Sequence, residues 1–206
     1  QNKKGGTADV VTGSSSASPS TVSGGYAQVV KNKSFCFLCL MFGFYFIAEH
    51  GILNWLVLYG RDQFFLEQGK ASLYLSLFFG GITAGRLIFA SVVQKLGTAR
   101  SIRIFGAGGT VLYAAGIFLT VFINISGFLV VLMFSGLIIS ILYPTMVLFI
   151  RKFYTENIIA TATGTIISAA TIFDIIFNLL FGHIVDSCGF SMSILILPIC
   201  MIYLYI

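Results

Sequence analysis

The sequence predicts an all-α membrane protein with six transmembrane helices, and two observations carry this prediction. Hydrophobic residues make up 57% of the 206 residues and charged residues only 9%, whereas soluble domains carry about 25% charged residues. The apolar residues also gather into long unbroken runs, whereas a membrane β-barrel needs strands of about ten residues with alternating polarity. Composition and pattern therefore exclude a soluble domain and favour helices that cross a bilayer.

The runs define the expected elements in order. Transmembrane spans are predicted at residues 35–59, 71–93, 104–123, 127–150, 158–183 and 191–206. A helix needs about 20 residues to cross the hydrocarbon core, and the first five runs meet that length. The sixth run stops after 16 residues and the chain begins at Gln1, so we expect a fragment of a longer protein at both ends.

The segment before the first span has a different composition. Residues 1–34 are polar, and residues 5–25 are rich in glycine and serine. Such a segment cannot bury a core and is typical of a flexible linker. We therefore expect a polar cytoplasmic linker over residues 1–34 and a six-span transmembrane domain over residues 35–206.

Positive charge is distributed unevenly between the two sides of the membrane. With a cytoplasmic N-terminus, nine lysines and arginines lie inside, while only Arg61 and Lys70 lie outside. This bias follows the positive-inside rule and predicts a multi-pass protein of the cell membrane with both ends cytoplasmic. The net charge of +5 is thus explained by topology, and no nucleic-acid partner is expected.

Small and polar residues recur at steps of three and four along three spans, so each set lies on one helix face. These sets are Ser72, Ser76, Gly80 and Thr83; Gly106, Gly109, Tyr113, Gly116 and Thr120; and Gly164, Ser168, Thr171, Asp174, Asn178 and Gly182. The second set indicates close helix packing, because small residues let membrane helices approach. The third contains an aspartate and an asparagine, which predicts a face that lines a cavity.

Glu49 is the first candidate functional residue. It lies in the run 35–59, which is otherwise apolar apart from His50 and Asn54. A carboxylate at membrane depth costs at least ~2.5 kcal/mol, so Glu49 needs water, a partner or a proton. The hypothesis is a carboxylate that couples transport to a proton or cation. The alternative is a buried partner for Arg86 or another polar group.

Asp174 is an equal candidate in the fifth span. With Asn178 four residues later it presents a carboxylate and an amide on one face, which suits a hydroxylated solute or a cation. The alternative is a structural hydrogen bond to another helix. His50 and Asn54 share this spacing, and the histidine either relays protons or donates to a backbone carbonyl. Trp55 is placed at the outer interface, where it could also stack on a sugar ring.

Several short motifs occur in the order known from one transporter family. One segment contains Gly85-Arg86-Leu87, followed by Gln94-Lys95-Leu96-Gly97-Thr98-Ala99-Arg100. It resembles the second loop motif of the major facilitator superfamily, which lies between the eighth and ninth helices of those proteins. Gln94 stands where that motif often has an acidic residue. Three further segments resemble helices of the branch that contains the fucose–proton symporter and sodium-dependent glucose transporter. The seventh helix corresponds to residues 45–59, the tenth to Tyr143-Pro144-Thr145, and the eleventh to residues 182–189.

The resemblance covers about residues 26–206 and implies the C-terminal half of a twelve-helix transporter. Residues 35–123 and 127–206 would form two inverted three-helix repeats. The missing N-terminal six-helix half would complete a midplane site for a small-molecule substrate, with a sugar as the expected class and a proton or sodium ion as the coupling ion. Arg86, Lys95, Gly97 and Arg100 would then have gating or structural roles.

Other functions remain open at this point. A second transport hypothesis is efflux of an amphipathic drug or organic anion, and a third is a receptor or scaffold of the same family that does not transport. The sequence contains no HExxH zinc motif and no GxSG nucleophile motif, each of which marks a type of hydrolase. We therefore expect no catalytic residue, no metal site and no bound cofactor.

Overall fold

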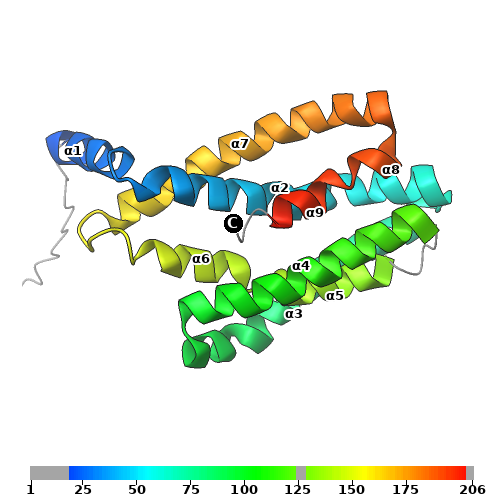
Figure 1. Ribbon diagram of the computed structural model, residues 1–206, viewed down its shortest axis with the longest axis horizontal. Helices are drawn as coiled ribbons and strands as arrows, with labels where there is room; N and C mark the ends of the chain where they lie inside the picture. The colour runs from blue at the N-terminus through cyan, green and yellow to red at the C-terminus, as the bar shows by residue number, and fades with distance from the viewer. Residues whose placement is uncertain (1–18, 124–128, 203–206) are drawn as a thin grey trace, which may run out of the picture.

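A computed structural model describes residues 19–123 and 129–202, and in this part of the chain the regular structure is helical. The elements are α1 (Pro19–Val30), α2 (Ser34–Phe64), α3 (Gln68–Leu96), α4 (Thr98–Ile123), α5 (Leu129–Ile139), α6 (Leu142–Ile150), α7 (Ile159–Cys188), α8 (Phe190–Ser193) and α9 (Ile196–Ile202). Figure 1 shows an elongated bundle, with α1, the α3–α4 turn and the α6–α7 connection gathered at one end.

Five helices of the described chain are long and apolar enough to cross a membrane: α2, α3, α4, the stretch Val130–Ile150 that contains α5 and α6, and α7. Each of the first five predicted spans falls on one of them, so the prediction of a helical multi-pass membrane protein is confirmed. The sixth predicted span corresponds to α8 and α9, which form a shorter apolar stretch, Phe190–Ile202. The last four residues of that span lie outside the described residues.

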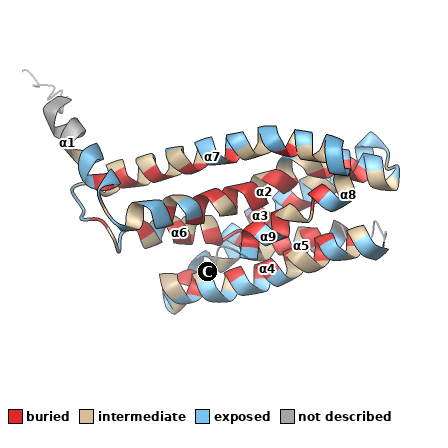
Figure 2. Cartoon of the chain, turned by 45° about the horizontal axis from the view of Figure 1, so that its top comes forward, coloured by how far each residue is buried: buried red, intermediate tan, exposed pale blue. Residues whose placement is uncertain are grey.

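Helix α2 is the centre of the bundle. It contacts α3, α6, α7, α8 and α9, and Figure 2 shows buried residues along much of its length, whereas one face of α7 is exposed. The largest of its fully buried side chains are Phe42, Tyr45 and Tyr59. From α4, the Tyr113 hydroxyl donates a hydrogen bond of 2.6 Å to the Ala48 carbonyl of α2. Polar residues on α2 therefore have protein on several sides.

Glycines let α3 and α4 approach α5 closely. A Cβ added at Gly81 of α3 would lie 2.7 Å from the Met133 carbonyl oxygen, and one added at Gly85 would overlap the Leu137 carbonyl. On α4, a Cβ at Gly116 would lie 3.0 Å from the Leu132 side chain. The glycine-rich face predicted in span 104–123 is buried. Its interpretation as a close packing surface is confirmed.

A single residue connects α3 and α4. Gly97 has φ +78°, a left-handed conformation that suits glycine. Its N–H bonds to the Val93 carbonyl at 2.9 Å, and its carbonyl accepts from the Ser101 N–H at 3.0 Å. Lys95 and Arg100 flank this turn with exposed side chains. Lys95, Gly97 and Arg100 thus lie at one end of the bundle, and their gating or structural role stays a prediction.

The structure differs from the linker prediction at residues 19–33. Part of this segment is helix α1, which contacts α7. Val29 is fully buried, and its carbonyl accepts a 3.2 Å hydrogen bond from the Tyr154 hydroxyl. The Asn32 side chain donates to the Phe153 carbonyl at 3.0 Å. The glycine and serine content predicted flexibility for the whole segment. Its apolar end instead buries Val29 and pairs its polar groups with the α6–α7 connection. Residues 1–18 lie outside the described residues.

Burial between α1 and the α6–α7 connection also affects the pKa of Tyr154. Tyr154 lies in the connection between α6 and α7, and desolvation by its neighbours raises the pKa of its phenol above the ordinary value. A phenol is protonated at neutral pH even at its ordinary pKa, and the upward shift extends the range over which the hydroxyl donates to Val29. The contact between α1 and the α6–α7 connection is therefore independent of pH in the physiological range.

The close approach of α3 and α5 gives a test of the fold. Gly85→Ala is expected to lower the free energy of unfolding by about 1–3 kcal/mol, because the added methyl overlaps the α5 backbone. Gly80 lies on the same helix with no atom within 4 Å of an added Cβ, so Gly80→Ala is the matched control and should be neutral or slightly stabilising. Unfolding in lipid–detergent micelles followed by circular dichroism measures both. Equal stability of the two variants would contradict the packing described.

Candidate functional site

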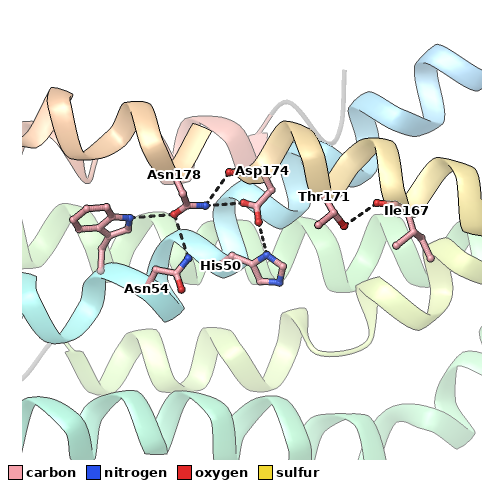
Figure 3. Close-up of polar contacts among 7 residues, drawn as sticks. His50, Asn54, Ile167, Thr171, Asp174 and Asn178 are labelled. Carbon is pink, nitrogen blue, oxygen red and sulfur yellow. Dashed lines mark hydrogen bonds and ion pairs between the residues drawn. The ribbon is translucent and has the colours of Figure 1, made fainter. Parts of the chain in front are cut away.

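A hydrogen-bonded polar network joins α2 and α7 (Figure 3). The Nδ1 atom of His50 lies 2.7 Å from Oδ2 of Asp174. One proton must lie between these atoms, because two lone pairs would repel each other at that distance. The Asn178 amide donates to Oδ1 of Asp174 at 2.9 Å and to the Asp174 backbone carbonyl at 3.0 Å. Both carboxylate oxygens of Asp174 are therefore bound within the protein.

Asn178 extends the network towards the next turn of α2. Its amide oxygen accepts from the Asn54 amide at 3.2 Å and from the Trp55 indole N–H at 3.1 Å. Asn178 is thus the residue that connects the aspartate to both of these side chains. The structure brings together all five predicted residues of this group: His50, Asn54, Trp55, Asp174 and Asn178.

The spacing of these residues explains how they meet. His50 and Asn54 lie one turn apart on α2, and Asp174 and Asn178 lie one turn apart on α7, so each pair occupies one helix face. When the two faces pack together, His50 lies opposite Asp174 and Asn54 lies opposite Asn178. Two successive turns of α2 are therefore joined by polar contacts to two successive turns of α7.

An open groove of about 390 Å³ lies beside the network. It is lined by Asn54, Trp55, Leu58, Asp174, Ile175, Asn178 and Leu179. Asp174 is only 5% exposed, whereas the His50 side chain is 37% exposed and Asn54 is exposed. Among the polar residues that line the groove, Asn54 is therefore more accessible to a bound molecule than Asn178 or Asp174. The predicted cavity-lining role of the α7 face agrees with this groove at Asp174 and Asn178.

Aromatic side chains fix the orientation of two network residues. The Phe46 ring stacks on the His50 imidazole with centroids 5.1 Å apart and planes at 18°. The Trp55 ring packs against Phe181 at 5.2 Å and Phe190 at 6.0 Å. Trp55 is therefore held against α7 and α8 by its indole hydrogen bond and by two rings. Its place at the outer membrane interface stays a prediction.

Glu49 points to the other side of α2 and takes no part in this network. It is 6% exposed, and its Oε1 lies 3.9 Å from the Arg86 guanidinium of α3. The Tyr45 hydroxyl, one turn earlier on α2, is buried and makes no hydrogen bond within the described chain. The predicted alternative for Glu49, a buried partner for Arg86, agrees with this geometry. The coupling hypothesis stays untested.

Sequence reasoning did not identify the residues that surround these polar groups. Phe46 precedes His50 by four residues and Tyr45 precedes Glu49 by four, so helical spacing alone would have placed each beside its partner. Tyr143 packs on Phe46 at 5.9 Å from α6, and no feature of its own span indicated that contact. Long-range packing partners require the arrangement of the helices.

Comparison of the chain with protein-family models, with curated proteins and with solved structures gave no match. Within the described residues, His, Cys, Asp and Glu side chains do not gather in groups of three or more that could hold a metal ion. The function of the site is therefore argued from its own residues.

Asn178 is the residue whose loss should weaken the α2–α7 contact most. Asn178→Leu is expected to lower the free energy of unfolding by about 1–3 kcal/mol, because it leaves donors and acceptors of the network without partners. Thr171→Ala is the matched control, since the Thr171 hydroxyl bonds only within α7, to the Ile167 carbonyl at 2.9 Å. Unfolding in micelles measures both variants, and a loss no larger than that of the control would show that the network does not hold the helices together.

Proposed function

We propose that this chain is the C-terminal half of a secondary transporter of the major facilitator type, which moves a small polar solute by alternating access. The supporting observation is the polar network of His50, Asn54, Asp174 and Asn178 beside a groove in membrane-spanning helices. Ionisable and amide side chains at membrane depth are costly and mark solute or ion pathways. The order of the family-like motifs supports the same proposal.

The membrane topology is part of this proposal. The α1–α2 link, the α3–α4 turn and the α6–α7 connection share one end of the bundle (Figure 1). Seven basic residues of the described chain belong to that end: Lys31, Lys33, Lys95, Arg100, Arg103, Arg151 and Lys152. This asymmetry supports a cytoplasmic position for that end. The two inverted repeats, residues 35–123 and 127–206, and the partner N-terminal half complete the proposed architecture.

The groups that remain accessible indicate the class of solute. Asp174 and Asn178 are bound to each other and to neighbouring side chains. Among the residues that line the groove, Asn54 keeps its amide oxygen and one amide hydrogen for a solute. These groups suit the hydroxyls of a neutral solute, and Leu58 and Leu179 of the groove suit its apolar ring face. A sugar therefore fits better than an organic anion, because the described residues that line this groove include no lysine or arginine.

Proton coupling fits the geometry better than sodium coupling. A sodium ion needs several oxygen ligands, but both Asp174 oxygens are already bound, one to His50 and one to Asn178. The His50–Asp174 pair instead already shares a proton between two side chains, a type of pair found in proton relays. Glu49, with Arg86 as its partner, is the second carboxylate that the proposal assigns to coupling.

Uptake by the full-length protein in proteoliposomes tests transport and coupling together. The expected result is accumulation of a radiolabelled monosaccharide driven by an inward proton gradient and not by a sodium gradient. The Glu49→Gln, Asp174→Asn double variant should lose accumulation while it retains downhill exchange. Full accumulation by the double variant would rule out carboxylate coupling. Monosaccharide binding without uptake by the unaltered protein would favour a receptor.

Asn54 gives a separate test of the solute site. Asn54→Ala removes one donor and one acceptor from the groove, so the KM for the transported sugar should rise about tenfold, as expected for a loss of about 1.4 kcal/mol. Ser76→Ala is the matched control, because the Ser76 hydroxyl bonds within α3, to the Ser72 carbonyl at 3.0 Å. An unchanged KM in Asn54→Ala would place the solute elsewhere.

A further inference from the structure

The fourth membrane-spanning stretch is broken between α5 and α6, and Pro144 explains the break. Helix α5 ends at Ile139 and α6 begins at Leu142. Proline has no N–H, so Pro144 cannot donate to the carbonyl four residues earlier, which belongs to Ser140. Ser140 is fully buried. A buried carbonyl at membrane depth without a donor is costly, so another group has to supply one.

Arg86 of α3 supplies this donor. Its Nε donates to the Ser140 carbonyl oxygen over 3.5 Å. The side chain reaches this carbonyl because the preceding residue, Gly85, brings the α3 backbone against Leu137 and Ser140. A residue with a Cβ at position 85 would hold the two helices apart. The glycine contact and the arginine contact are therefore parts of one arrangement.

The other end of the same guanidinium faces Glu49. Its terminal nitrogen lies 3.9 Å from Oε1 of Glu49 on α2. Guanidinium carries its donors in a rigid planar fork, so one side chain can contact two acceptors from different helices. Arg86 thus connects α2, α3 and the break between α5 and α6. The Glu49 carboxylate restrains the guanidinium in the position from which it reaches Ser140.

We propose that Arg86 is a positioning residue that replaces the hydrogen bond lost at Pro144 and so holds the α5–α6 break in one conformation, with Glu49 keeping Arg86 in place. The break is then a hinge whose angle depends on a side chain of another helix. This inference goes beyond the proposed function, because it concerns the conformation of one span and holds whether or not the protein transports a solute.

The hinge is also in contact with the polar network. Tyr143, next to Pro144, packs on Phe46 at 5.9 Å, and Phe46 stacks on His50 at 5.1 Å. A change in the direction of α6 moves Tyr143 and therefore the ring that orients His50. The Arg86 contact joins α3 to the α5–α6 break, and the His50 contact joins α2 to α7. Tyr143 and Phe46 connect the break to His50 through packing.

Distances between spin labels on α5 and α6 test the proposal in the full-length protein in lipid nanodiscs. Phe134 and Leu148 are 52% and 45% exposed and flank the break, so labels at Phe134→Cys and Leu148→Cys report its angle. The native cysteines of the protein, including the four in this chain, are replaced by alanine first. We expect one narrow distance distribution with Arg86 present, and a broader or shifted distribution in Arg86→Gln. Glu49→Gln should change it in the same direction and to a smaller extent.

Pro144→Ala provides the decisive comparison, because an alanine N–H can donate to the Ser140 carbonyl. In that background Arg86→Gln should leave the distance distribution unchanged. Arg103→Gln is the control for loss of a basic side chain, since Arg103 bonds within its own helix, to the Ala99 carbonyl. If Arg86→Gln does not fold, Arg86→Lys gives the same comparison, because an ammonium lacks the guanidinium fork. If Arg86→Gln leaves the distance distribution unchanged when Pro144 is present, the proposal is overturned. It is also overturned if Arg86→Gln changes the distribution equally with Pro144 and with Pro144→Ala.

Discussion

The structure depends on one constraint, which is that polar groups at membrane depth have to find their partners inside the protein. Helix α2 carries two ionisable residues next to each other, and each turns to a different neighbour. Glu49 lies near Arg86 of α3, and His50 pairs with Asp174 of α7. The central position of α2 follows from this, because only a helix with protein on both sides can satisfy two such residues.

The glycine faces of α3 and α4 help to meet the same constraint, that polar groups at membrane depth find partners inside the protein. A guanidinium 3.5 Å from a carbonyl of another helix requires that the two backbones lie close, and Gly81 and Gly85 permit this. In α4, the buried glycines let the same α5 pack from the other side. Helix α5 is thus held tightly between α3 and α4, while α6 contacts α4, α7 and α2. Small residues therefore fix the α5 part of the broken span against its two neighbours.

The sequence predicted the helices and the polar faces, but not which faces meet. Long apolar runs can only be helices in a bilayer, so the first five spans were predictable from composition and length. The i, i+4 spacing placed His50 with Asn54 and Asp174 with Asn178, because helix geometry is local. Their pairing across α2 and α7 depends on the arrangement of distant segments. The helix at residues 19–30 was missed, because its contacts with α7 and with Tyr154 depend on distant segments and not on its own composition.

The hydrogen-bonding groups of the polar network are already paired with one another, and this limits how the network could act. Asp174 and Asn178 use their hydrogen-bonding groups on one another, on His50 and on α2 side chains, so a molecule in the groove gains little from them unless a bond within the protein is broken. Breaking the His50–Asp174 contact leaves a carboxylate that is only 5% exposed without its cationic or proton-sharing partner. Such a state is costly, because it leaves a buried charge without a partner. Separation of α2 from α7 therefore requires a new partner for Asp174, whatever solute the groove receives.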